Sequence, residues 1–82
     1  MSEPVEKTVP LSTLTPGQRG RVASISLPGS AKGRIMELGL TVGVTVEVVR
    51  FAPLGDPIEL KVRGGHLSIR KSEASAILVE KQ

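Results

Sequence analysis

The side chains able to support catalysis or metal binding are few in this sequence, and they do not cluster. His66 is the only histidine, and there is no cysteine. The acidic residues of the central region are scattered, namely Glu37, Glu47, Asp56 and Glu59. A metal site needs several converging ligands, and acid–base catalysis needs positioned groups of suitable pKa. We therefore predict no metal site, no cofactor and no enzymatic activity, and we interpret His66 as an exposed hairpin residue.

Binding of nucleotides or nucleic acids has little support in the residue types. Residues 28–33 (Pro-Gly-Ser-Ala-Lys-Gly) lie between a predicted strand and a predicted helix, but they lack the spacing of a phosphate-binding loop. Phe51 is the only aromatic residue, so the stacking platforms of single-strand binding proteins are missing, as is an aromatic groove for proline-rich peptides. Residues 19–71 hold nine Lys or Arg and four Asp or Glu. This basic surface could meet an acidic partner, nucleic acid or an anionic membrane, or it could serve solubility alone.

The length of 82 residues predicts one domain with an aliphatic core, because 24 residues are Val, Leu or Ile. We predict residues 1–8 as a disordered tail and residues 9–82 as a single domain. No apolar run approaches the roughly 18 residues that a membrane span needs. The N-terminus lacks the basic-then-apolar order of a signal peptide. We therefore expect a cytoplasmic protein without a membrane span.

The pattern of apolar residues predicts a mainly-β fold. Alternation indicates strands at residues 21–27, 44–51, 58–63, 66–70 and 77–79, with a two-residue Gly64-Gly65 turn between the third and fourth. Val49 beside Val48 breaks the alternation, which indicates either a bulge or burial of both faces of the strand at this point. The first element, residues 9–14, is predicted as a short anchoring segment. About five short strands predict a small, strongly bent sheet, and closure into a barrel would hide its edges.

Helical structure is predicted at two places. A short helix follows the first strand, with Ser30 as its N-cap and Ala31, Ile35 and Leu38 as its apolar stripe. Gly39 stands where a left-handed residue ends a helix, and Leu40 is expected to fold back onto Ile35. A single helical turn at residues 72–75 precedes the last strand.

Residues 52–59 (Ala-Pro-Leu-Gly-Asp-Pro-Ile-Glu) form what we call the proline loop. Pro53 and Pro57 fix their own φ, lack a backbone donor and push the preceding residues toward extended backbone. The loop should be stiff, with Leu54 near its tip. A stiff loop that carries an apolar residue is a candidate recognition surface rather than a catalytic one.

Together, these segments resemble the ferrous-iron transport protein A (FeoA) family. The resemblance rests on residues 34–40 (Arg-Ile-Met-Glu-Leu-Gly-Leu), Gly43, residues 46–50, the proline loop and residues 67–74, and it covers about residues 10–80. It implies a small SH3-like β-barrel without enzymatic activity that works beside FeoB, the membrane ferrous-iron transporter with a cytoplasmic guanine-nucleotide-binding domain. The family has no agreed catalytic or metal residues to carry over. Gly33 inside the helix and residues 64–66 at the hairpin tip depart from its usual pattern.

Within this reading we predict Arg34, Ile35, Met36, Leu54 and Asp56 as partner-binding residues. Ile35 also lies on the apolar stripe, so it is expected in the core, whereas Met36 should point outward. Leu54 has two interpretations at this stage, a partner contact or a plug at the end of the barrel. The alternative function is a basic SH3-like regulatory or nucleic-acid-binding module, because the predicted barrel also resembles the C-terminal domain of iron-dependent repressors. No specific nucleic acid is expected.

Overall fold

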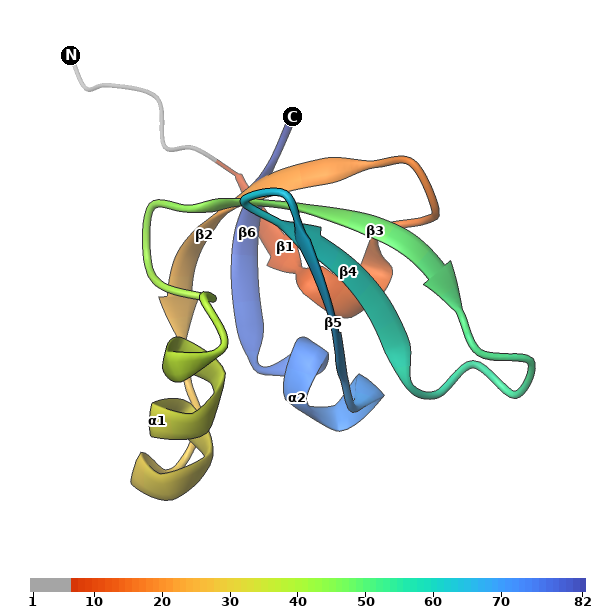
Figure 1. The fold of residues 1–82 in the computed structure, drawn as a ribbon. Helices are drawn as coiled ribbons and strands as arrows, with labels where there is room; N and C mark the ends of the chain where they lie inside the picture. The colour runs from red at the N-terminus through yellow and green to blue at the C-terminus, as the bar shows by residue number, and fades with distance from the viewer. Residues whose placement is uncertain (1–6) are drawn as a thin grey trace, which may run out of the picture.

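The computed structural model describes residues 7–82 and shows a bent β-sheet with two short α-helices (Figure 1). Residues 1–6, most of the predicted tail, lie outside the described residues. The elements in chain order are β1 (Thr8–Pro10), a 3-10 helix (Leu11–Thr13), β2 (Arg19–Ile25), α1 (Gly29–Glu37), β3 (Thr45–Phe51), β4 (Ile58–Val62), β5 (Gly65–Ile69), α2 (Lys71–Ser75) and β6 (Ile77–Lys81). The mainly-β prediction and both helices are confirmed.

The sheet is open, which corrects the prediction of a five-stranded closed barrel. Six antiparallel strands follow the order β1-β6-β2-β3-β4-β5. The additional strand is β1, which begins at Thr8, inside the predicted tail, and pairs with β6. Register shifts at Val22/Ser24 and Val48/Arg50 mark irregularities of the kind that bend sheets. The second of them lies where the sequence left a bulge or burial of both faces as alternatives, and it favours the bulge. Closure into a barrel would require β1 to pair with β5. β1 has only three residues and ends at Pro10, which has no backbone N–H to donate, so few hydrogen bonds to β5 could form.

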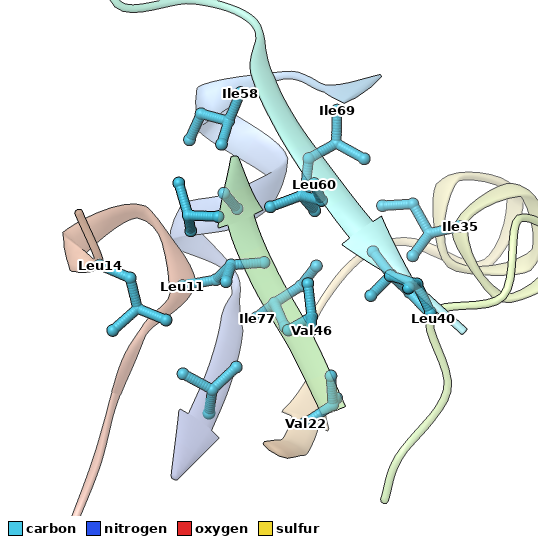
Figure 2. Close-up of a cluster of buried hydrophobic side chains, with 14 of the residues drawn as sticks. Leu11, Leu14, Val22, Ile35, Leu40, Val46, Ile58, Leu60, Ile69 and Ile77 are labelled. Carbon is cyan, nitrogen blue, oxygen red and sulfur yellow. The ribbon is translucent and has the colours of Figure 1, made fainter. Parts of the chain in front are cut away.

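The core is entirely aliphatic within the described residues (Figure 2). Leu11 in the 3-10 helix and Leu14 directly after it belong to this core, which confirms the anchoring segment. Ile35 and Leu40 attach α1 and its following turn to the core, and both are fully buried. Leu38 was predicted to share this role, but it is 43% exposed. The backbone of Leu38 is still helical, and its N–H donates to the carbonyl of Arg34 over 3.1 Å. Its exposure therefore reflects the narrow face by which α1 packs on the sheet, where Ile35 is the buried residue of the helix.

The end of α1 follows the prediction. Gly39 has a φ of +108° and donates from its N–H to the carbonyl of Met36 over 3.0 Å. The N–H of Leu40 donates to the carbonyl of Ile35 over 3.2 Å. These two bonds form the Schellman motif that glycine permits. The start differs, because α1 begins at Gly29 and its N-cap is Pro28, with no side-chain hydrogen bond, so Ser30 lies inside the helix.

The β4–β5 hairpin is present, but its turn is Arg63-Gly64 rather than Gly64-Gly65. Both turn residues have positive φ, 53° and 83°, as a type I′ turn requires. Val62 therefore pairs with Gly65, and Leu60 with Leu67. The predicted register would also have matched apolar residues with apolar residues, because both registers keep the same side-chain faces. Alternation alone cannot distinguish them.

Candidate functional site

The proline loop is fastened to α2 by Asp56. One carboxylate oxygen of Asp56, Oδ1, accepts the backbone N–H of Lys71, the first residue of α2, over 3.0 Å. Within the loop, the N–H of Gly55 donates to the carbonyl of Ala52 over 2.7 Å, and the N–H of Ala52 donates to the carbonyl of Pro57 over 3.0 Å. The loop is thus internally bonded and attached at its base, which fixes the direction of its tip.

Helix α1 is fastened to the same short helix by an ion pair. The guanidinium of Arg34 contacts the carboxylate of Glu73, whose side chain is only 13% exposed. The other carboxylate oxygen of Glu73 accepts the N–H of Arg70 over 2.9 Å. Burial by itself raises the pKa of Glu73, but the hydrogen bonds from Arg70 and Arg34 and their positive charges outweigh it. The net result is a pKa below the usual 4.5, so the carboxylate is ionised at neutral pH.

An open groove of about 750 Å³ lies between α1 and the end of β5. Its walls come from α1, from the base of the proline loop, and from the β5–α2 junction, namely Ser30, Ala31, Arg34, Pro57, Ser68, Ile69, Arg70 and Glu73. The lining combines polar side chains with the apolar surfaces of Ala31, Pro57 and Ile69. We call this the α1–β5 groove. Its volume lies in the range of ligand sites, about 300–1,000 Å³.

The structure brings together only some of the five predicted partner-binding residues. Arg34 and Asp56 both bond to α2. Arg34 pairs with the carboxylate of Glu73, and Asp56 accepts the N–H of Lys71. Ile35 is fully buried, as its place on the apolar stripe predicted. It packs in the core beneath α1 and has no exposed surface for a partner to contact.

Met36 and Leu54 lie apart on the molecule. Met36 is 42% exposed on α1, whereas Leu54 is 96% exposed in the proline loop, which projects from the opposite side of the view in Figure 1. The interpretation of Leu54 as a plug is therefore wrong. A role for these two residues in partner contact stays a prediction.

Sequence reasoning missed the residues that organise the groove, above all Glu73 and Arg70. The available signal was an acidic residue in the first turn of a helix, three positions after the N-cap, where a carboxylate bonds the free N–H of the cap. Arg70 is that cap, and Glu73 fills the position. Its pairing with Arg34 had no sequence signal, because it depends on where α1 packs.

Potential metal-ligating side chains do not cluster in the part of the chain that the structure describes. Residues 7–82 contain no group of three or more His, Cys, Asp or Glu side chains placed to hold an ion. His66 is exposed in the hairpin, as predicted. Among the same residues, no helix has the length and apolar character needed to cross a membrane.

Comparison with known proteins gives a consistent family. The sequence model of the FeoA domain matches residues 9–81. A fusion of Fe(2+) transport protein A with the Fe(2+) transporter FeoB from Porphyromonas gingivalis is 34% identical over 70 residues, which is 85% of this chain and 8% of that protein. The chain thus spans a small fraction of that relative. The solution structure of the FeoA protein from Chlorobium tepidum is 43% identical, with a TM-score of 0.84 over 88% of this chain and 69% of that one.

The fold also occurs in larger regulatory proteins. A manganese-dependent transcriptional repressor superposes with a TM-score of 0.86 over 96% of this chain and 44% of that protein, with 19% identity. At this identity the likeness concerns the fold alone. It agrees with the expected similarity to a repressor domain without indicating a shared activity.

Proposed function

Because this chain belongs to the FeoA family, we propose that it is a cytoplasmic accessory protein of ferrous-iron uptake that binds a FeoB-type transporter and regulates it. The observation that carries the proposal is the fused relative. In that protein an FeoA unit and FeoB are parts of one chain. Domains joined in one chain stay at high effective concentration, so even a modest contact between them is populated. When the two domains are separate chains, the same contact is populated only if their binding affinity is high enough at the concentrations present.

The surface of the domain suits binding rather than catalysis. Three of its arginines form ion pairs within the domain: Arg34 with Glu73, Arg50 with Glu59 and Arg21 with Glu80. The Arg34–Glu73 pair lies in the α1–β5 groove, and Arg50–Glu59 together with the bond from Lys71 N–H to Asp56 fastens the base of the proline loop. A preformed surface loses little entropy on association, which favours a regulatory contact.

The test is co-purification and turnover with the full-length FeoB-type transporter of the same organism. The tagged full chain should retain the detergent-solubilised transporter, and the transporter's GTP hydrolysis or iron uptake in vesicles should change when the chain is added. A matched control uses the thermally unfolded chain at the same concentration. Absence of binding together with unchanged turnover would refute the proposed function.

The nucleic-acid-binding alternative is addressed by the same preparation. Basic charge alone gives binding that falls steeply with salt. We expect no mobility shift of duplex DNA or RNA at about 150 mM salt. A specific complex that persists there would favour the regulatory module instead.

A further inference from the structure

Strand β5 is a free edge of the sheet. It pairs with β4 alone, as the strand order shows. The two-residue turn makes Val62 and Gly65 a hydrogen-bonded pair, and such pairs alternate along an antiparallel ladder. Leu67 and Ile69 consequently face β4 with their backbone groups. His66 and Ser68 direct their N–H and C=O groups outward, and these groups have no other backbone partner within residues 7–82.

The other edge is much less suited to pairing. β1 has three residues and ends at Pro10, which lacks an N–H. Short edges that carry proline are protected against the addition of a further strand. β5 has five residues, no proline and outward groups spaced two residues apart, so it is the edge that can accept another strand.

Helix α1 runs beside this edge and forms a second wall. Near its C-terminal end, a Cβ built on Gly39 would lie 3.8 Å from Val62 at the end of β4. In its N-terminal half, Ser30, Ala31 and Arg34 line the α1–β5 groove opposite Ser68 and Ile69. A groove bounded by an edge strand on one side and a helix on the other fits one extended segment. Peptide-binding domains that add a strand to a sheet edge use such edges, with main-chain bonds for affinity and pockets for specificity.

The charge of the groove selects an acidic segment. Its lining has two arginines and one carboxylate, and that carboxylate, Glu73, already pairs with Arg34 and the N–H of Arg70. The guanidinium of Arg70 has no ion-pair partner among residues 7–82. Lys71 follows it and is exposed. A carboxylate placed at this end of the groove would complete the charge balance.

From these observations we propose that β5 and α1 hold an extended acidic segment of the transporter, which adds to the sheet as a strand antiparallel or parallel to β5. Its main chain bonds the outward groups of His66 and Ser68, and an Asp or Glu side chain pairs with Arg70. This inference rests on the proposed function and specifies its contact.

The experiment is a titration of the isotope-labelled full chain with overlapping synthetic peptides that cover the cytosolic segments of the same organism's FeoB-type transporter. An Asp- or Glu-containing peptide should shift the amide signals of His66 and Ser68 and slow their hydrogen exchange. Ser68→Pro removes one outward donor, and proline is tolerated at exposed edges. We expect it to weaken binding at least tenfold, whereas Ser68→Ala, which keeps the N–H, should stay within about twofold of wild type.

A charge variant provides an independent arm that does not touch the sheet. Arg70→Gln should weaken the same peptide several-fold and reduce the salt dependence of binding, while Lys81→Gln, at the far end of β6, should leave both unchanged. The fold of each variant is checked by its amide spectrum. Peptides that shift other residues only, or Ser68→Pro binding as wild type does, would overturn the proposal.

Capture of the intact transporter by wild type and by Ser68→Pro distinguishes a failure of the strand-addition contact from a failure of the proposed function. If wild type and Ser68→Pro retain the transporter equally, the function stands and the strand-addition contact is wrong. If neither binds, both are refuted. Sedimentation adds one outcome: self-association of wild type that Ser68→Pro abolishes would make a second copy the occupant and overturn the acidic segment.

Discussion

Arg34 and Glu73 form an ion pair that joins α1 to α2, although 39 positions separate them in the sequence. Asp56 bonds the N–H of Lys71 at the start of the same helix. Five residues of α2 thus connect the two regions that carry the family resemblance, the helix and the proline loop. Both regions are therefore fastened to the same short helix.

The Arg34–Glu73 pair should contribute more to stability than an ordinary surface pair. Glu73 is largely buried, whereas Glu80, which pairs with Arg21 over 3.1 Å, is more exposed. A double-mutant cycle with Arg34→Met and Glu73→Gln, measured by urea unfolding, should give a coupling energy of about 1 kcal/mol. The matched cycle with Arg21→Met and Glu80→Gln should give about 0.5 kcal/mol or less. Equal coupling energies would contradict the structural role of α2.

Acid should weaken the domain through Glu73. Its pKa in the folded state lies below the usual 4.5, so its contribution is complete above that value and is lost as the pH falls through the folded pKa. Urea unfolding between pH 7 and pH 3 should therefore show a decline that begins near pH 4.5. Glu73→Gln should have a smaller decline because it has no proton to take up. Glu37→Gln, an exposed carboxylate on α1, corrects for the loss of one acidic group, and a decline as large in Glu73→Gln as in this control would contradict the assignment.

Two glycines of one helical segment should respond oppositely to alanine. Gly33 lies inside α1 with open space around its Cβ position, so Gly33→Ala should raise the free energy of unfolding by about 0.5–1 kcal/mol. Gly39 has a φ of +108°, and Gly39→Ala should lower it by about 1–2 kcal/mol. Thermal and urea unfolding measure both. The opposite order of stabilities would show that the Schellman end is not formed in solution.

The exposed apolar residues predicted from the sequence allow a separate binding test. Leu54→Asp should leave the free energy of unfolding within about 0.5 kcal/mol, because the side chain is 96% exposed. Met36→Asp, at a half-buried position, should cost about 1 kcal/mol. Either substitution should weaken capture of the transporter if its residue contacts the partner. Unchanged capture by both folded variants would remove Met36 and Leu54 from the contact surface.

Local patterns predicted most of the secondary structure correctly for identifiable reasons. Gly39 followed by Leu40 specified the end of α1, and adjacent Val48 and Val49 marked the position of the register shift in β3, because both features depend on a few neighbouring residues. The start of α1 and the hairpin turn were each misplaced by a residue or so. In the hairpin, two registers satisfy the same apolar alternation, and the difference lies in which residue takes the first positive φ, here Arg63.

The sequence by itself determined the family, the mainly-β fold and the aliphatic core, because these follow from apolar spacing, turn residues and a specific run of prolines and glycines. Only the tertiary structure decided that the sheet stays open, that Leu54 projects into solvent, and that Arg34, Asp56, Glu73 and Arg70 gather around α2. Those facts depend on how distant segments pack. A free edge such as β5 can be identified only from the pairing of all the strands, which the sequence does not give.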